Sequence, residues 1–374
     1  MKSAGLKLLF IFFGLVCCQV SMAQVVNPGL MDTTDIEAKG KFTIEGYIDT
    51  YYGNSINNPK NASLYYFVSS ARHNEVNINL AYVALKYNYK NIRAKFIPGF
   101  GTFMNANYAS EPGSLKNLVE ANVGICLSGK RNIWVDVGVL GSPYTNESAV
   151  SKDHLMYTRS LAAEYAPYYL SGARFSFPLS KKLTSFIYLL NGWQVIQENN
   201  TQKALGTQLE FRPNKKVLIN WNTFTGDERS FLKPQYRQRY FSDIYLVWSP
   251  SPKWDITSCA YYGIQQEKQT RRQVDYPWWQ ANFIFRYHFN KKHSLAGRVE
   301  YFNDPRQVII PAQTGLTKES KMGGGGLCWN IRLNENALFR LENRVLAAKQ
   351  NLFYYDGKLS KLFNWSVVNL TVWF

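Results

Sequence analysis

Charged side chains recur at alternate positions along segments whose other positions are apolar. Arg93 and Lys95 are spaced in this way, and so are Arg340, Glu342 and Arg344. Because residues at i and i+2 lie on the same face of a β-strand, these charges share a face opposite the apolar side chains. Charged groups on such a face can select solutes by charge and dipole. The pattern therefore predicts a charged, hydrated interior surface.

Motifs for catalysis, metal binding and phosphate binding are missing from the sequence. The four histidines are dispersed, and only His288 falls within an expected strand, with no serine motif to complete a nucleophile–base pair. The glycine run 323–326 lacks the Lys-Ser/Thr of a phosphate-binding loop. The three cysteines after residue 23 have neither metal-site nor disulfide-framework spacing. We expect no enzyme activity, no cofactor and no metal site.

Sixteen alternating segments occupy the chain from residue 41 to residue 374. Their typical lengths match the roughly 9–11 residues of a tilted membrane-spanning strand, and bacterial single-chain barrels have an even number of strands. After residue 23 no apolar run reaches about 18 residues, which excludes a helical membrane protein. We expect an all-β fold, a transmembrane antiparallel up-and-down β-barrel. The expected strands are 41–53, 74–89, 92–104, 119–128, 132–140, 170–178, 183–194, 203–212, 216–226, 237–249, 254–265, 277–289, 294–303, 322–333, 336–347 and 362–374.

Connection lengths support this division independently. Short connections follow every even-numbered strand, and longer ones follow every odd-numbered strand. Outer-membrane barrels alternate short periplasmic turns with long outer loops in this way. The longest connection is 141–169, and we expect it to fold inward and narrow the interior, since it mixes charges with large apolar residues. The alternative for this segment is a mobile surface loop.

The two ends of the chain predict export to the bacterial outer membrane. Residues 1–23 combine early lysines, an apolar stretch and a Ser-Met-Ala ending, which is typical of a secretory signal peptide. Residues 24–40 show no alternation, so we expect a periplasmic N-terminal tether there, with part of the filling of the barrel interior as the alternative. The closing segment alternates up to Phe374, as expected of a barrel's last strand. The expected division is 1–23 signal peptide, 24–40 tether and 41–374 barrel.

Alternation also assigns residues to the lipid or the interior. A mid-depth charge on the lipid face would cost about 2–4 kcal/mol, so charged strand residues should face inward. In 277–289 the residues expected to face lipid are Trp279, Ala281, Phe283, Phe285 and Tyr287, with Gln280, Asn282, Arg286 and His288 inward. In 74–89 the residues expected to face lipid are Val76, Ile78, Leu80 and Tyr82, and those expected to face inward are Asn77 and Asn79.

A barrel of sixteen strands is wide enough for an aqueous channel, which predicts passive diffusion of small polar or charged solutes. The interior charges are slightly positive in sum, so we expect a weak anion preference. The net charge of +17 comes largely from lysines in the short turns, and no nucleic-acid-binding motif accompanies them. The expected pore-lining or constriction residues are Glu147, Arg159, Glu164, Arg174, Arg93, Lys95, Asp136, Arg286, Arg340 and Arg344.

Four motifs between residues 147 and 193 carry a family resemblance. They are Glu147-Ser148-Ala149, Tyr157-Thr158-Arg159, Pro167-Tyr168-Tyr169 with Gly172-Ala173-Arg174, and Leu190-Asn191-Gly192-Trp193. This stretch resembles the OmpL-like β-barrel porin family. The resemblance implies a Bacteroidota-type outer-membrane porin in contact with lipid and lipopolysaccharide, with no particular substrate. One departure is Tyr144-Thr145-Asn146, where members tend to have an aromatic or Gly-Phe pair.

Several alternatives stay open on the sequence. A soluble β-sandwich would also alternate. A non-conducting barrel could act as an adhesin or interaction scaffold through outer loops such as 54–73 and 304–321. An open interior would favour the channel, and a plugged one would favour the scaffold. Both a monomer and a homotrimer are compatible with the pattern.

Overall fold

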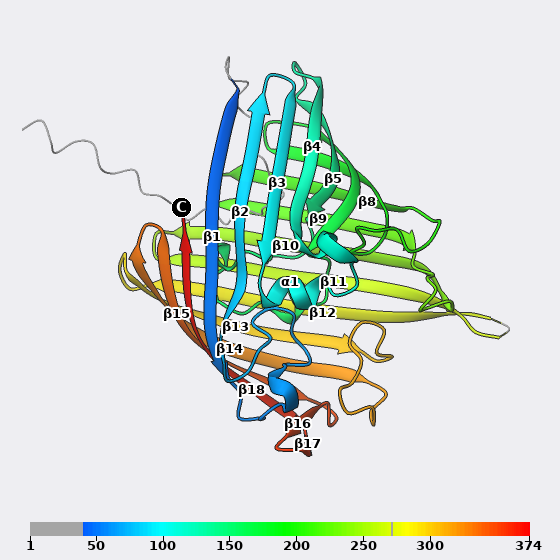
Figure 1. The fold of residues 1–374 in the computed structure, drawn as a ribbon, viewed down its shortest axis with the longest axis vertical. Helices are drawn as coiled ribbons and strands as arrows, with labels where there is room; N and C mark the ends of the chain where they lie inside the picture. The colour runs from blue at the N-terminus through cyan, green and yellow to red at the C-terminus, as the bar shows by residue number, and fades with distance from the viewer. Residues whose placement is uncertain (1–39, 271) are drawn as a thin grey trace, which may run out of the picture.

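Sixteen strands close into one antiparallel barrel in the computed structural model, which describes residues 40–270 and 272–374 (Figure 1). β1 (Lys41–Asn54) pairs with both β2 and the last strand, β18 (Leu362–Trp373), so the wall has no free edge. The barrel therefore confirms the expected fold and strand number. The other wall strands are β2 (Val76–Tyr89), β3 (Ile92–Phe100), β4 (Leu118–Ser128), β5 (Ile133–Gly141), β6 (Tyr169–Pro178), β7 (Leu183–Leu190), β8 (Ala204–Asn214), β9 (Val217–Asp227), β10 (Tyr236–Ser251), β11 (Trp254–Lys268), β12 (Gln273–His288), β13 (His293–Asp304), β14 (Ser320–Asn334) and β15 (Ala337–Ala348).

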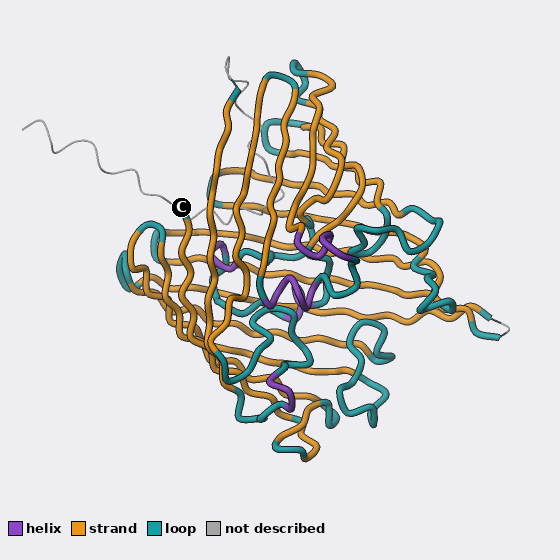
Figure 2. Tube along the Cα trace, in the orientation of Figure 1, coloured by secondary structure: helices purple, strands orange, loops and turns teal. Residues whose placement is uncertain are grey.

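Short turns join the strands at one end of the barrel, and longer loops gather at the other (Figure 2). The loops carry a two-stranded hairpin and several short helices. Among the described residues, no helix is both long and apolar enough to cross a lipid bilayer. The hairpin and helices are β16 (Phe353–Tyr355), β17 (Lys358–Ser360), α1 (Thr102–Asn107), α2 (Leu161–Glu164), η1 (Lys60–Ala62), η2 (Gly113–Asn117) and η3 (Ser151–Asp153). The expected signal peptide 1–23 and all of the tether except Gly40 lie outside the described residues.

The strand boundaries agree with the expected ones to within a few residues. β3 ends four residues early, because Gly101 has a φ of 131° and the chain turns there into α1. A Cβ at Gly101 would lie 2.4 Å from the backbone oxygen of Asn79, so only glycine fits this close approach.

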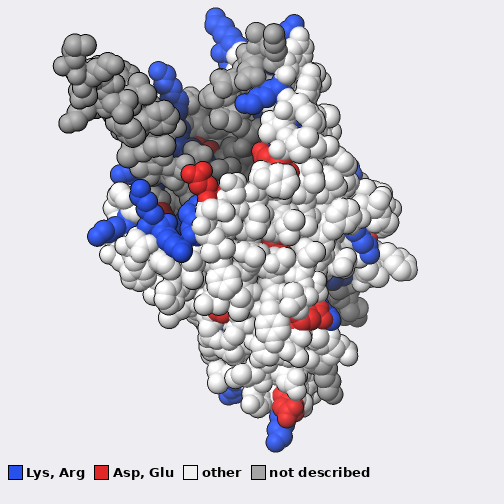
Figure 3. Space-filling model, turned by 60° about the vertical axis from the view of Figure 1, so that its left-hand side comes forward, with Lys and Arg blue, Asp and Glu red and all other residues white. Residues whose placement is uncertain are grey.

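The outer surface of the barrel is apolar at the positions that alternation assigns to lipid. In β12, Trp279 and Phe283 are exposed whereas Gln280 and Asn282 are buried, as expected. Val299 and Leu327 on β13 and β14 are 62% and 58% exposed. Figure 3 shows the result as a broad uncharged face of the barrel. Such a surface is stable in the hydrocarbon of a membrane.

β2 corrects one of the face assignments. The β1–β2 register shifts just after Asp49, which leaves Asn79 as an extra residue in β2. A β-bulge of this kind moves the following residues to the opposite face. Leu80 is therefore fully buried, and Tyr82 stacks on the buried Tyr47 with ring centroids 5.0 Å apart. The prediction that Leu80 and Tyr82 face lipid was wrong.

Paired glycines bend the wall where the longest connection begins and ends. Gly138 of β5 is directly opposite Gly172 of β6, and their φ values are 131° and 149°. A Cβ on Gly138 would lie 2.2 Å from the backbone oxygen of Ala121, and one on Gly172 would lie 2.0 Å from that of Leu189. Glycine at both positions lets the chain leave and rejoin the wall at a sharp angle.

Candidate functional site

The connection between β5 and β6, residues 142–168, lies inside the barrel; we call it the inserted loop. Most of its side chains are buried, and Met156, Tyr157 and Arg159 are 0% exposed. Its apolar residues are divided between two buried clusters: Met156 and Leu161 pack in one with inward side chains from β7 to β15, and Val150 packs in the other with side chains of β1 to β3. The inserted loop is therefore packed against the inner side of the barrel wall and is largely shielded from solvent.

Two wall carboxylates bind the backbone of the inserted loop. Glu342 of β15 accepts hydrogen bonds from the backbone N–H groups of Tyr157 and Thr158, at 2.7 and 3.0 Å, and from the Thr158 hydroxyl. Glu300 of β13 accepts one from the N–H of Leu161 at 2.6 Å. Bonds from N–H to a carboxylate are about twice as strong as neutral ones, so these contacts fix the path of the loop.

Three wall arginines bind the carbonyl groups of the same loop. Arg340 donates to the carbonyl of Ser151 at 2.8 Å, and Arg344 donates to that of Arg159 at 2.9 Å. Arg298 donates to the carbonyl of Thr158 at 2.7 Å. Arg344 and Arg298 also bind Glu300, at 2.7 and 3.2 Å. The charged groups of β13 and β15 therefore pair with one another and with the loop.

Further contacts anchor the start of the inserted loop to the neighbouring wall. Asp243 of β10 accepts a hydrogen bond from the N–H of Thr145 at 2.6 Å, and Asn222 of β9 donates to the carbonyl of Pro143 at 3.0 Å. The loop leaves the wall at β5, and its anchors extend along the wall from β9 to β15. It therefore crosses the barrel interior.

Charges near the roots of the loop pair with one another across strands. Asp136 of β5 forms salt bridges with Arg93 of β3 at 2.7 Å and with Arg174 of β6 at 2.8 Å. Lys95 of β3 binds Glu120 of β4 at 2.9 Å. All five side chains are at least nine-tenths buried, and the Asp136 side chain is fully buried. We call this group the wall charge cluster.

The expected site residues lie in four places: the wall charge cluster, β15 beside the inserted loop, β12 near the short-turn end, and the inserted loop itself. Arg93, Lys95, Asp136 and Arg174 are brought together in the wall charge cluster, and Arg340 and Arg344 bind the loop. Arg286 binds Asp255 at 2.7 Å near the short-turn end. Within the loop, Glu147 accepts from the N–H of Ser160 at 2.7 Å, Arg159 donates to the carbonyl of Ser148 at 3.2 Å, and Glu164 accepts from the N–H of Val68 at 2.7 Å.

Sequence reasoning missed the role of the wall carboxylates as ligands of the loop. Glu300, Glu342 and Asp243 follow the inward alternation, but their partners are backbone N–H groups of a distant segment. Every residue except proline carries such a group, so the sequence holds no signal for the pairing.

A serine and a histidine lie close together inside the inserted loop. The backbone N–H of Ser148 donates to His154 Nε2 at 2.8 Å, and the Ser148 hydroxyl lies 3.4 Å from the same nitrogen. Nδ1 of His154 has no hydrogen-bond partner among the described residues. Burial, with nearby Arg159, lowers the pKa of His154 well below its usual value. The arrangement is that of a neutral structural imidazole.

Acidic groups of the inserted loop hold protons more tightly than usual. Burial raises the pKa of Asp153 to about 6, partly offset by Lys152 at 3.6 Å. Burial also raises the pKa values of Glu147 and Glu164. No cluster of metal-ligating residues occurs in residues 40–270 and 272–374.

A closed sixteen-stranded barrel with an inserted loop and a charged interior defines an outer-membrane barrel of the porin class. The family model described as "Putative beta-barrel porin-2, OmpL-like" matches residues 41–371. The chain therefore belongs to this family of outer-membrane porins, as the motifs between residues 147 and 193 predicted.

Solved porin structures share the fold at low sequence identity. An anion-selective porin from Comamonas acidovorans has a TM-score of 0.61 and 10% identity, covering 90% of this chain and 100% of that chain. OmpF of Salmonella typhi, in complex with daunomycin, has a TM-score of 0.59 and 11% identity, covering 90% and 98%. The trimer form of Vibrio cholerae OmpT has a TM-score of 0.56 and 10% identity, covering 90% and 99%. Comparison with curated proteins gives no significant match.

Proposed function

We propose that this porin is a narrow diffusion channel for small polar or charged solutes, constricted by the connection 141–169. The observation that carries the proposal is the anchoring of the inserted loop by Glu342, Glu300, Arg340 and Arg344. A loop held by charged hydrogen bonds inside a barrel of this width reduces its cross-section while leaving a polar lining. The buried His154 accepts a hydrogen bond from the Ser148 backbone, which supports a structural role for this imidazole in a transport protein.

The wall charge cluster supports a weak anion preference. It holds three cationic side chains, Arg93, Lys95 and Arg174, and two carboxylates, Asp136 and Glu120, which leaves one net positive charge. This positive excess raises the electrostatic potential inside the barrel, which favours anions. The anion-selective porin among the structural neighbours has the same fold, which is compatible with this preference.

One observation favours a second function, a closed barrel that acts as a scaffold or adhesin. The outer loops also pack inward: Phe67 lies against Arg344 at 4.7 Å, and Ile310 and Leu352 are fully buried. These contacts narrow the outer mouth beyond the inserted loop. A channel and a scaffold therefore differ in whether a continuous water path remains.

Liposome swelling distinguishes the two functions. Full-length refolded protein is placed in liposomes and challenged with arabinose, glucose and raffinose, with protein-free liposomes as the control. A narrow channel gives swelling that falls steeply with sugar size. Protein that shows a heat-modifiable, folded barrel but no swelling with arabinose would overturn the channel and support the scaffold.

We further propose export to the outer membrane, with 1–23 as the signal peptide, 24–40 as a tether and 41–374 as the barrel in contact with lipid and lipopolysaccharide. A homotrimer is supported by a polar pair on the lipid face, Asn343 of β15 and Ser366 of β18, bonded at 2.7 Å. Polar groups are costly in hydrocarbon, and a neighbouring copy would cover them. Native mass spectrometry of detergent-extracted protein would show three chains, and a single chain would contradict the trimer.

We expect the anion preference of the channel to depend on pH because of the carboxyl group of Asp153. Because its pKa is about 6, the carboxyl loses its charge as the pH falls from about 7 to about 5. Loss of this negative charge increases the anion preference, measured as the reversal potential in a salt gradient. Asp153→Asn should show the stronger preference already at neutral pH and a weaker pH dependence.

The groups that face Asp153 are Lys152, Arg340 and Glu45. The ionised carboxyl is penalised in the folded state, so its contribution to stability falls as the pH rises from the usual carboxyl pKa toward 6. A reversal potential that does not change between pH 7 and pH 5 in the wild type would contradict a charge at Asp153 that solutes sense.

A further inference from the structure

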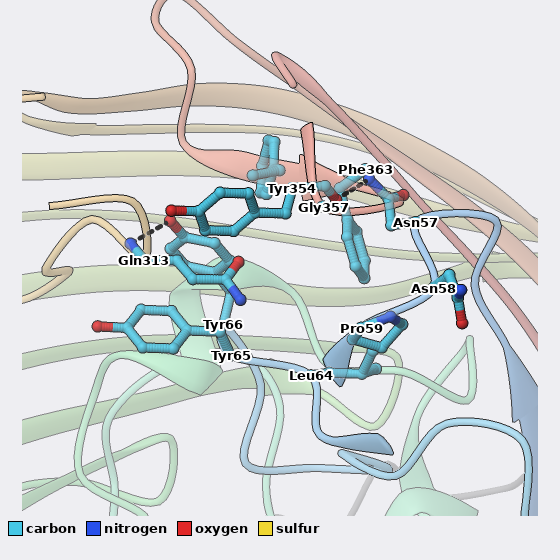
Figure 4. A pocket seen from close by; sticks show the side chains of 11 residues that line it. Asn57, Asn58, Pro59, Leu64, Tyr65, Tyr66, Gln313, Tyr354, Gly357 and Phe363 are labelled. Atoms are coloured by element: carbon cyan, nitrogen blue, oxygen red, sulfur yellow. Dashed lines mark hydrogen bonds between the residues drawn. The ribbon is translucent and has the colours of Figure 1, made fainter. Parts of the chain in front are cut away.

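A pocket of about 500 Å³ opens among the outer loops (Figure 4). We call it the outer pocket. Three loop regions and the start of β18 form it, and its volume lies within the usual range of roughly 300–1,000 Å³ for small-molecule sites. Its lining includes Asn57, Tyr65, Tyr66, Gln313, Phe353, Tyr354 and Phe363.

Aromatic rings form a continuous series along the outer pocket. Tyr65 contacts Tyr66 edge-on with ring centroids 5.0 Å apart, and Tyr66 contacts Phe353 in the same way at 5.1 Å. Phe353 lies 5.6 Å from Phe363. The buried rings support Tyr65, which is 50% exposed and offers a flat, rigid apolar surface on which another flat group can stack.

The lining carries no charge. None of its residues is Lys, Arg, Asp or Glu, although the chain has a formal net charge of +17. A charged ligand would lose its hydration in such a pocket without gaining a counter-charge from the lining. The pocket therefore favours an uncharged ligand.

Hydrogen bonds between loops fix the shape of the outer pocket. The Asn57 side-chain amide donates to the carbonyls of Tyr354 and Leu362, at 2.9 and 2.8 Å. The Tyr66 hydroxyl donates to the carbonyl of Leu352 at 2.5 Å and accepts from the N–H of Gln313 at 3.0 Å, which Figure 4 shows. A pocket held in this way loses little freedom when a ligand binds.

Polar groups of the lining remain available to a ligand. The hydroxyls of Tyr65 and Tyr354 and the side-chain amide of Gln313 make no hydrogen bond to the described residues. These groups both donate and accept hydrogen bonds. Flat apolar rings beside neutral hydroxyls and amides match a ligand that has an apolar face and a rim of hydroxyl groups.

We infer that the outer pocket binds a short neutral oligosaccharide. A pyranose ring stacks its C–H face on Tyr65 or Tyr354, and its hydroxyls bond to the phenols and to the Gln313 amide. The loops place this site at the outer mouth of the barrel. The inference goes beyond the channel and does not depend on conduction, because binding in the outer pocket is measured without transport.

Calorimetric titration of the full-length protein tests the inference, in a detergent without sugar groups. The probes are maltotriose, cellotriose, xylotriose, mannotriose and chitotriose, each up to about 10 mM. At least one neutral trisaccharide should bind saturably. Trigalacturonic acid and the chitosan trimer should bind at least about tenfold more weakly.

Three variants locate the site. Tyr65→Ala and Tyr354→Ala should each weaken binding by about fivefold to tenfold, and Tyr65→Phe should retain most of the stacking. Tyr355→Ala is the matched control, because Tyr355 is 49% exposed on the same hairpin but does not line the outer pocket. Heat-modifiable mobility confirms that each variant is folded.

Four outcomes would overturn the inference. The first three are no binding of any neutral probe to folded wild type, equal binding of charged and neutral trisaccharides, and binding that neither alanine variant weakens. Loss of binding in Tyr355→Ala to the same extent as in Tyr65→Ala would also overturn it, because the effect would then not be specific to the lining.

Discussion

We expect deletion of residues 148–162 to increase the single-channel conductance of the refolded barrel severalfold. The deleted residues include most of the groups that Glu342, Glu300, Arg340 and Arg344 hold inside the barrel. Without them the interior is limited by the wall, and a wider aqueous path carries more ions. The measurement is conductance in planar bilayers at fixed salt, for the wild type and the deletion variant side by side.

A milder variant accompanies the deletion, because a missing loop can impair folding. Glu342→Gln keeps the shape of the side chain and removes the charge that receives the N–H groups of Tyr157 and Thr158. We expect intermediate behaviour, with noisier current and a smaller increase in conductance. If both variants are folded by heat-modifiable mobility and both conduct as the wild type does, the inserted loop is not the constriction.

Asp136→Ala lowers the stability of the barrel by about 3–5 kcal/mol. Asp136 is fully buried between the guanidinium groups of Arg93 and Arg174 and binds both. Truncation removes the carboxylate and leaves two cationic groups close together in a buried site. The measurement is the free energy of unfolding in urea or guanidinium with the protein in micelles, or the temperature at which heat-modifiable mobility is lost.

The control for this effect replaces Asp136 together with both of its guanidinium partners. A triple variant with Arg93→Met, Asp136→Leu and Arg174→Met removes both signs of charge, and similar replacements of buried ion groups are often neutral or stabilising. We expect it to regain most of the lost stability. A loss of less than about 0.5 kcal/mol for Asp136→Ala would place the residue among ordinary surface sites and contradict its role.

Alternation along single strands predicted the wall, because the period of two is a local property that each strand repeats. In β12 it assigned Trp279 and Gln280 to the correct faces. The error at Leu80 and Tyr82 has a physical cause, since one extra residue at Asn79 changes the period and nothing in the neighbouring sequence marks it. Loop parity was predictable because the direction of an antiparallel strand sets the end at which each connection lies.

The site could be predicted only in part. The cost of a charge in lipid placed Arg93, Arg174 and Asp136 inside the barrel. Their pairing joins β3, β5 and β6 through the register of β4, which no local pattern specifies. The outer pocket was not predictable either, because Asn57 and Tyr66 lie in loops without periodicity and act through backbone groups of other loops.

Single-channel recording of the full-length protein in a planar bilayer, with the reversal potential taken in a potassium chloride gradient, tests the central claim most directly. A narrow channel gives stable, discrete, small current steps and a reversal potential of the sign that indicates a weak anion preference. A folded, heat-modifiable barrel that passes no current would contradict the channel, and clear cation selectivity would contradict the proposed lining.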